Sequence, residues 1–186
     1  MSSYTKIDNY YIIENVITDD QINQLVNWFE SIESTTTVTH GGDWDTSSTS
    51  IVRLECPYRT KSVIGVPYDT FPFIQEIFTN MFATVIDSEF SLEGPPYLAR
   101  YDVGDRHGTH VDKNDKWPNR HWLASIQLSD PDSYQGGDLY VDRGNGDFTV
   151  SAPRNKGYGI IYSGDLLHLV SPIIEGSRYS LTESAG

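Results

Sequence analysis

The spacing of apolar residues divides the chain into a helical part and a strand-rich part. Apolar residues recur every three or four positions after Thr18-Asp19-Asp20, whose side-chain oxygens are of the kind that cap a helix start. The same spacing returns after Pro72, a residue that suits a first helical turn. The apolar positions are Ile22, Leu25, Val26, Phe29 and Ile32, and then Ile74, Ile77, Phe78, Met81, Phe82 and Val85. The pattern predicts two amphipathic helices, each with one face in a core.

After Gly94-Pro95-Pro96 the pattern changes to short segments that alternate or are continuously apolar, separated by Gly, Asp, Asn and Pro turns. Strands are predicted near 97–102, 107–112, 121–128, 138–142, 147–152, 157–162, 168–172 and 178–182. Short strands with turns at such regular intervals are typical of a sandwich or barrel, here with helices in front of it.

The polar stretch from Ser34 to Ser50 shows no period and predicts a long loop, which is either a functional lid or a disordered segment. No internal repeat and no linker divides the chain. We therefore expect residues 1–186 to form one domain, with a helical flank and N-terminal strands in 1–92 and a core barrel in 93–186.

The amino-acid composition limits the kinds of molecule that we expect the protein to bind. The formal net charge is -13 and the pI is about 4.5, so phosphate backbones and anionic lipid surfaces would be repelled. We expect neither nucleic acid nor membranes as partners, whereas a basic or neutral peptide is tolerated. The single Cys56 excludes an internal disulfide. No signal peptide is visible and no apolar run approaches the roughly 20 residues that cross a bilayer, so a soluble, cytoplasmic protein is expected.

The segment His110-Val111-Asp112 places an imidazole and a carboxylate two residues apart. In a strand they would project from one face, while Val111 would point into the core. His168, which follows the Gly164-Asp165 turn, is the best candidate for a third ligand. Two histidines and one carboxylate occupy one face of an octahedral metal and leave the opposite positions free, which suits iron(II) oxygenase chemistry. A structural zinc site would have four ligands and would more often use cysteine.

Arg178 lies ten residues after His168, in the segment Gly176-Ser177-Arg178-Tyr179-Ser180. Its guanidinium is a permanently charged fork that can bind a carboxylate through two hydrogen bonds. Ser180 shares its face of the predicted strand and can add a hydroxyl donor. A lone arginine is usually a surface charge, but the position of Arg178 relative to His168 favours a carboxylate site.

Taken together, these motifs resemble the iron(II)/2-oxoglutarate dioxygenase superfamily, in particular its prolyl 4-hydroxylase-like branch with the bacterial PKHD-type hydroxylases. The resemblance covers about half the chain. The matching run is Tyr101-x-x-Gly104, His110-x-Asp112, Leu128-Ser129-Asp130-Pro131-Asp132-Ser133-Tyr134-x-Gly136-Gly137-Asp138-Leu139, Lys156-Gly157, His168 and Arg178.

The resemblance implies a mainly β fold with flanking helices, a double-stranded β-helix with the metal inside one mouth. It implies that His110, Asp112 and His168 hold iron(II) and that Arg178 holds 2-oxoglutarate, with dioxygen as the second cosubstrate and ascorbate as a reductant. Ser180, Tyr101 and Gln127 match positions that often contact the cosubstrate. No further catalytic residue is expected, because the metal and cosubstrate carry the chemistry.

One departure from the family pattern lies beside the metal site, where His107 stands in place of the usual tyrosine of a YxxHxD arrangement. His107 could form a wall of the substrate pocket, add a titrating group near the metal, or be a loop residue. The pocket wall is the favoured interpretation.

The resemblance implies hydroxylation of a substrate C–H bond, with release of succinate and carbon dioxide. A prolyl or other peptidyl side chain is the first expectation for the substrate. The same chemistry on a free amino acid or small metabolite is an alternative. A non-catalytic ligand-binding or sensing barrel is another, against which the complete set of metal ligands and Arg178 argues. A metal-binding cupin is a third, although cupins tend to use HxH spacing and this chain has HxD.

Overall fold

The computed structural model describes residues 4–32, 37–39, 50–144, 146–148 and 152–186. It contains helices α1 (Asp19–Ser31) and α2 (Pro72–Val85) and a 3-10 helix, η1 (Pro131–Ser133). The strands are β1 (Tyr4–Ile7), β2 (Tyr10–Ile13), β3 (Thr37–Thr39), β4 (Val52–Cys56), β5 (Arg59–Gly65), β6 (Tyr97–Tyr101), β7 (Arg106–His110), β8 (Trp122–Gln127), β9 (Tyr134–Gly136), β10 (Leu139–Val141), β11 (Gly159–Ser163), β12 (His168–Val170), β13 (Ile173–Gly176) and β14 (Arg178–Ala185).

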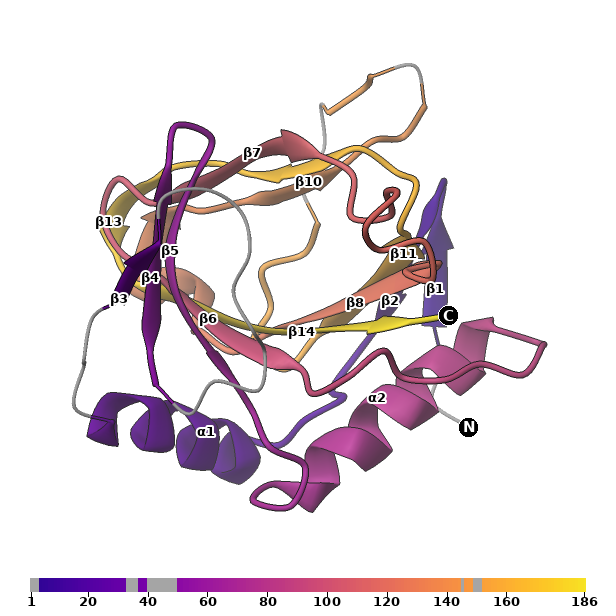
Figure 1. Cartoon of the computed structure of the whole chain (residues 1–186), viewed down its shortest axis with the longest axis horizontal. Helices are drawn as coiled ribbons and strands as arrows, with labels where there is room; N and C mark the ends of the chain where they lie inside the picture. The colour runs from indigo at the N-terminus through magenta and orange to yellow at the C-terminus, as the bar shows by residue number, and fades with distance from the viewer. Residues whose placement is uncertain (1–3, 33–36, 40–49, 145, 149–151) are drawn as a thin grey trace.

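The strands form a sheet that curls on itself. Its order is β1-β2-β11-β8-β14-β6-β5-β7-β12-β10, with β4 also paired to β5, and a separate pair joins β13 to β9. All of these neighbours are antiparallel, and only the short β3 runs parallel to β4. Figure 1 shows β7 and β10 lying across the interior from β6, β14 and β8. The arrangement is a double-stranded β-helix, as expected from the sequence.

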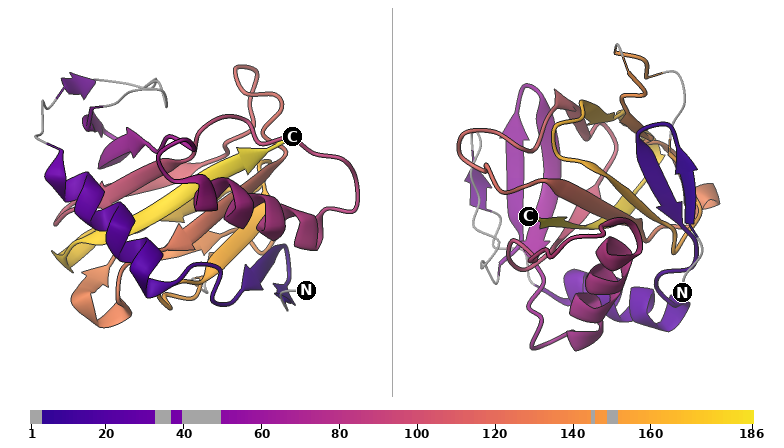
Figure 2. Two further views of the ribbon diagram at one scale, coloured as in Figure 1. Left: turned by 90° about the horizontal axis from the view of Figure 1, so that it is seen from below. Right: turned by 90° about the vertical axis from the view of Figure 1, so that its right-hand side faces the viewer.

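Both predicted helices are present, and both lie on one face of the sheet (Figure 2). The Thr18 side chain accepts a hydrogen bond from the Gln21 backbone while the Gln21 side chain reaches back to the Thr18 backbone, so a complete capping box starts α1. Pro72 occupies the first turn of α2, where its missing N–H is not needed. The apolar faces of the helices pack against outward-facing residues of the sheet such as Ile126, Ile161 and Leu181.

Alternation along the strands sends every second residue to the helices and the others into the barrel. On β14, Leu181 belongs to the core beneath the helices, whereas Arg178 and Ser180 face inward and are buried. On β8, Ile126 packs toward the helices, while Ser125 and Gln127 line the interior. Because successive side chains of a strand point to opposite faces, polar residues two positions apart both lie inside the barrel.

Several predicted boundaries need correction. The strand expected at 147–152 is wrong for Asp147 and Phe148, which lie outside any strand, and residues 149–151 lie outside the described residues. Strands β4 and β5 and strands β9 and β13 were not predicted. The loop expected from Ser34 to Ser50 contains the short strand β3, and its residues 34–36 and 40–49 lie outside the described ranges.

Candidate metal and cosubstrate site

The three predicted metal ligands meet at one mouth of the barrel. His110 ends β7 and His168 begins β12, and these two residues are direct partners in the antiparallel ladder. Asp112 follows β7, where its backbone N–H donates to the carbonyl of Gly164 at 3.2 Å. The Asp112 carboxylate lies 3.1 Å from Nε2 of His168 and 3.7 Å from Nε2 of His110. One ligand atom from each residue falls within 4.8 Å of the others, so the three can share an ion.

The strand argument for the His110–Asp112 pair is only partly right. Strand β7 ends at His110, and Val111 is half-buried outside both apolar cores. Asp112 is instead aimed by the hydrogen bonds that its backbone N–H and that of Lys113 donate to Gly164. The turn that precedes β12 thus positions the carboxylate beside His168.

Both histidines present the same ring nitrogen to Asp112. Nδ1 of His110 lies 2.7 Å from the carbonyl of Gly108, and Nδ1 of His168 lies 3.0 Å from that of Leu166. A carbonyl can only accept, so each Nδ1 is placed to carry a proton, and each Nε2 can offer its lone pair to a metal once it carries no proton of its own. Burial, followed by the charge of His168, lowers the pKa of His110 to about 4. Burial opposes ionisation of Asp112, but the hydrogen bond from His168 and the imidazole charges hold its pKa well below the usual range.

Arg178 lies in the same cavity as these ligands, directly opposite Tyr101 in the ladder between β14 and β6. Only 3% of its surface is exposed, and its guanidinium lies 5.5 Å from the centre of the Tyr101 ring. Its Nε donates to Oε1 of Gln127 at 3.1 Å. Within the described part of the chain, its two terminal nitrogens make no hydrogen bond or ion pair, although a buried cation normally has one. Such an arginine fits the distal carboxylate of a dicarboxylate ligand.

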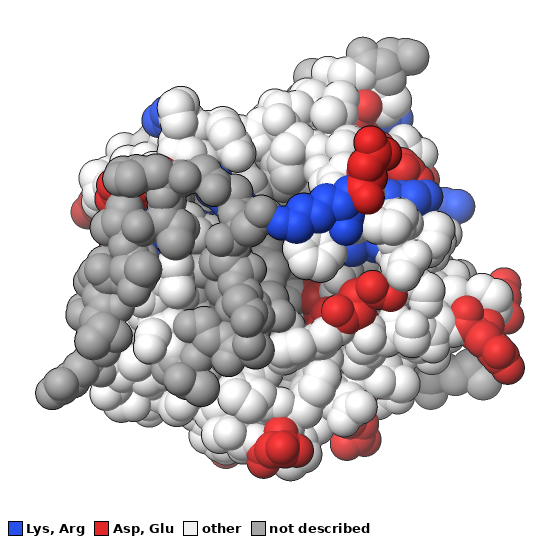
Figure 3. Space-filling model, viewed as in Figure 1, with Lys and Arg blue, Asp and Glu red and all other residues white. Residues whose placement is uncertain are grey.

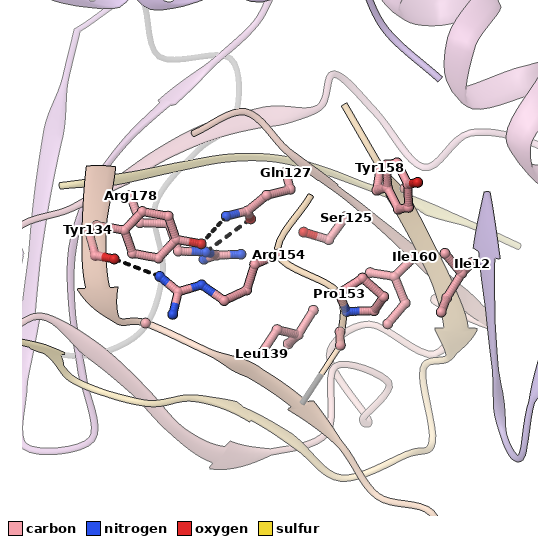
Figure 4. A pocket seen from close by; sticks show the side chains of 13 residues that line it. Ile12, Ser125, Gln127, Tyr134, Leu139, Pro153, Arg154, Tyr158, Ile160 and Arg178 are labelled. Carbon is pink, nitrogen blue, oxygen red and sulfur yellow. Dashed lines mark hydrogen bonds between the residues drawn. The ribbon is translucent and has the colours of Figure 1, made fainter. Parts of the chain in front are cut away.

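The remaining predicted residues fall into two groups. Tyr101, Ser180 and His107 line the cavity that contains the three ligands, which we call the metal-side cavity. Gln127 lines a neighbouring cavity around Arg154, which we call the Arg154 cavity. Figure 4 shows Gln127 between Arg178 and Tyr134, with its Nε2 donating to the Tyr134 hydroxyl and its Oε1 accepting from Arg178. Gln127 therefore contacts Arg178, which also lines the metal-side cavity.

His107 belongs to β7 and is not a loop residue. Its ring stacks on that of His110, with 3.7 Å between centroids, and it forms part of the wall of the metal-side cavity. Burial, followed by the charge of Lys61, lowers the pKa of His107 well below its usual value. It is thus placed as a neutral wall residue next to a ligand.

Several residues of the metal-side cavity were not predicted from the sequence, namely Tyr97, Ser125, Tyr162, Thr182 and the nearby Lys61. Tyr97, Ser125 and Thr182 could have been found, because each lies an even number of residues along its strand from a predicted site residue, as Tyr97 does from Tyr101. Tyr162 lies on β11, which carries no predicted site residue. Lys61 lies on β5, a strand that the pattern of apolar residues does not indicate.

The donor set fits a divalent metal of the iron type. Two imidazole Nε2 atoms with free lone pairs and one ionised carboxylate make a three-ligand face that leaves other coordination positions open. The buried guanidinium in the same cavity fits a carboxylate ligand. Fold and site together define a double-stranded β-helix with a candidate open metal site and a buried arginine in one cavity.

Comparison with known proteins shows a family resemblance over residues 96–183. Residues 96–183 match the 2OG-Fe(II) oxygenase superfamily. A PKHD-type hydroxylase of Bordetella pertussis is 37% identical over 93 residues, which cover 46% of this chain and 40% of that protein. This stretch of the chain is thus similar to the 2OG-Fe(II) oxygenase superfamily and to PKHD-type hydroxylases. The chain matches less than half the length of that curated relative.

Solved structures extend the likeness to the whole fold. A prolyl hydroxylase from Trichoplax adhaerens, in complex with a peptide fragment of the hypoxia inducible factor oxygen degradation domain, has a TM-score of 0.70 at 13% identity, covering 96% of this chain and 83% of that one. The non-heme α-ketoglutarate-dependent epimerase SnoN from nogalamycin biosynthesis has a TM-score of 0.71 at 11% identity, covering 96% and 78%. At such identities the likeness concerns the fold alone.

Acidic and basic side chains are distributed differently over the surface. Acidic side chains are scattered over the face seen in Figure 3, several of them at the lower edge where the helices lie. Basic side chains gather in one band in the region of the connection between β7 and β8, which carries Lys113, Lys116 and Arg120. No helix among the described residues is long and apolar enough to cross a membrane.

Proposed function

We propose that the protein is an iron(II)- and 2-oxoglutarate-dependent dioxygenase that hydroxylates a C–H bond of its substrate. The observation that carries this proposal is the presence, in one cavity, of the open ligand set His110, Asp112 and His168 and of a buried arginine without a carboxylate partner among the described residues. A three-ligand metal site alone, or a buried arginine alone, would fit several classes of protein. The two together match a metal chelated by a cosubstrate with a distal carboxylate.

The residues would divide the work as follows. His110, Asp112 and His168 hold the metal, and the carbonyls of Gly108 and Leu166 keep each imidazole in the tautomer that can bind it. Arg178 holds the distal carboxylate of 2-oxoglutarate. A bound iron(II), with 2-oxoglutarate and dioxygen as cosubstrates, would supply the oxidising power for hydroxylation, with succinate and carbon dioxide as the coproducts and one oxygen atom transferred to the substrate.

The other walls of the cavity orient the cosubstrate and exclude water. Ser180 and Tyr101 flank Arg178 from β14 and β6, and both are 3% exposed. Either hydroxyl can donate a hydrogen bond to a carboxylate held by Arg178. Tyr162, also buried, places its ring 4.9 Å from that of His168 and shields that ligand. A dry cavity strengthens the electrostatic contacts with the cosubstrate.

For the substrate we propose a prolyl or other peptidyl side chain. The support is the name of the curated relatives, PKHD-type hydroxylases, and the peptide complex of the Trichoplax neighbour. A small metabolite is the second candidate, since a neighbour of equal structural similarity is an epimerase of antibiotic biosynthesis. The outer wall formed by His107 suits either substrate, because a neutral imidazole adds shape and no charge.

The test is a screen for oxygen transfer with matched site variants. Protein loaded with iron(II), 2-oxoglutarate and ascorbate is incubated with proline-containing peptides and with free amino acids, and mass spectrometry records the gain of one oxygen together with succinate formation. We expect turnover with peptides that is lost in the Asp112→Ala variant. Turnover of 2-oxoglutarate by that variant at the parent rate would refute the assignment, and turnover of free amino acids alone would refute the peptidyl substrate.

A further inference from the structure

Lys61 is a buried lysine beside the metal-side cavity, behind two of the tyrosines that line it, and the proposed mechanism has no use for it. It lies on β5, where Arg59, Lys61 and Val63 project to the same side of the strand, and Val63 belongs to the core inside the barrel. Only 3% of its surface is exposed. Its Nζ lies 4.7 Å from the ring centre of Tyr97 and 5.5 Å from that of Tyr101, two residues of the cavity wall.

The ammonium has no anionic partner among the described residues. Among the residues that the structure describes, none forms a hydrogen bond or ion pair with Lys61, which contacts the two tyrosine rings instead. Ring contacts of this kind contribute about 0.5–2 kcal/mol and satisfy none of the three N–H donors. Because lysines are almost never fully buried unless paired, a cation that can still take an acceptor lies next to the cavity wall.

Two partly buried arginines of this protein have carboxylate partners, unlike Lys61. Arg53 forms two hydrogen bonds with the carboxylate of Asp105, and Arg100 pairs with Asp102 and Glu30. The fold therefore supplies carboxylates where a cation is structural. At Lys61 it supplies none, and burial, followed by the charge of Arg59, lowers the pKa of Lys61 to about 7.

The charges of the proposed site leave Lys61 unmatched. Asp112, a divalent metal, a dicarboxylate and Arg178 sum to zero, so the Lys61 ammonium is one positive charge in excess. The β7–β8 connection beside the site is also basic, in a chain whose formal net charge is -13. Arg120 of this connection acts electrostatically on Asp112. A local positive field of this kind attracts anionic ligands.

We propose that Lys61 binds a carboxylate group of a ligand in the metal-side cavity, as a second anion-binding cation beside Arg178. The inference rests on the proposed function and adds a substrate class to it. The carboxylate belongs either to 2-oxoglutarate or to the primary substrate, which would then be a free acid such as an amino acid derivative or a peptide with a carboxylate next to the reacting carbon.

The first arm of the test measures binding of 2-oxoglutarate by calorimetry to the Mn(II)-loaded protein without oxygen. The variants are Lys61→Met, which removes the charge at similar volume, Lys61→Arg, which keeps it, and Lys6→Met, which removes an exposed lysine from β1. If the cosubstrate is the ligand, Lys61→Met binds it about 10- to 100-fold more weakly, while Lys61→Arg recovers part of the loss and Lys6→Met matches the parent.

The second arm compares N-acetylated amino acids with their amides as stimulators of succinate formation. If the primary substrate carries the carboxylate, the parent and Lys6→Met prefer the acids at least about 10-fold, and Lys61→Met loses this preference while binding 2-oxoglutarate normally. A Lys61→Met variant that equals the parent in both arms overturns the proposal. A parent that fails to bind Mn(II) or 2-oxoglutarate at all refutes the proposed function instead.

Thermal unfolding separates ligand binding from a structural role. Replacing a buried cation that lacks a partner removes a desolvation cost, so Lys61→Met without metal or ligand should unfold at the same temperature as the parent or at a higher one. A lysine that stabilised the fold would give the opposite result, and a fall of several degrees would count against the proposal.

Discussion

The metal-side cavity and the Arg154 cavity share three lining residues, Ser125, Leu139 and Arg178. They differ in how far the protein itself supplies partners for their cationic side chains. In the Arg154 cavity, Nη2 of Arg154 donates to the carbonyls of Pro131 and Tyr134 at 3.3 and 2.7 Å. Its Nη1 lies 3.5 Å from Asp138, and its guanidinium lies 4.2 Å from the centre of the Tyr134 ring. The terminal nitrogens of Arg154 are therefore already paired within the protein, and its Nε is the one donor of this side chain that no described residue satisfies.

Arg178 in the metal-side cavity and Lys61 beside it have donors that no described residue satisfies. The terminal nitrogens of Arg178 and the ammonium of Lys61 have no anionic partner among the described residues, and both side chains are more deeply buried than Arg154. The difference teaches that burial alone does not mark a ligand-binding cation. What marks it is burial together with donors that the fold leaves unsatisfied.

The largest effect is expected at the carboxylate of the metal-side cavity. Asp112→Ala removes the one anionic ligand and leaves two neutral imidazoles, so we expect iron(II) affinity to fall by more than about 100-fold, beyond the loss typical of an outer contact. Equilibrium dialysis with iron(II) or Mn(II) measures it. Asp165→Ala, which removes an exposed carboxylate that pairs with Lys113, is the matched control and should bind metal normally.

Arg178→Met should spare the metal and weaken the cosubstrate. Removing one partner of a buried charge pair costs about 2–5 kcal/mol, so we expect 2-oxoglutarate to bind at least about 30-fold more weakly. Calorimetry on the Mn(II)-loaded protein gives both numbers. If Arg178→Met bound 2-oxoglutarate as well as the parent, the contrast between the two cavities would lose its main support.

The ligands and Arg178 could be predicted from the sequence because their signals are local. His110 and Asp112 lie two residues apart, and His168 and Arg178 stand at turns that are visible as glycine and acidic residues. The helices were predicted for the same reason, since the apolar spacing that places Ile22, Leu25 and Phe29 in the core is continuous in sequence. Each signal spans fewer residues than the element it predicts.

The rest depends on contacts between distant segments. The inward positions of β5 are Arg59, Lys61 and Val63, so cations stand where an alternating strand would show apolar residues, and the pattern that identifies strands is broken. Periodicity turns Gln127 inward, as observed, but it cannot tell which of two cavities the side chain enters. That depends on Tyr134 and Arg178, which accept from it and donate to it across the barrel.

In the Arg154 cavity, Arg154→Met should lower stability and leave the metal-side chemistry unchanged. The variant frees the carbonyls of Pro131 and Tyr134 and removes a ring contact, which we expect to cost about 1–2 kcal/mol of the free energy of unfolding. Urea denaturation checks this value. Affinity for 2-oxoglutarate within about threefold of the parent, a difference below about 1 kcal/mol, would sharpen the comparison, whereas a loss equal to that of Arg178→Met would break it.

The smallest effect is expected where the two cavities meet, at Gln127. Its Oε1 accepts from Nε of Arg178 and its Nε2 donates to the Tyr134 hydroxyl, so both halves of the amide are used within the protein. Gln127→Leu leaves the arginine charged but less constrained, and we expect about a tenfold loss in 2-oxoglutarate affinity, equal to about 1.4 kcal/mol, with metal affinity unchanged.

Tyr134→Phe removes only the far acceptor of this chain of hydrogen bonds and should have a smaller effect in the same direction. If Gln127 instead contacted the cosubstrate directly, Tyr134→Phe would have the opposite effect. Its loss of the hydroxyl would free Nε2 of Gln127 for the cosubstrate, so 2-oxoglutarate would bind equally well or more tightly. The order of affinities, parent above Tyr134→Phe above Gln127→Leu above Arg178→Met, is therefore the signature of a residue that positions the arginine from the neighbouring cavity.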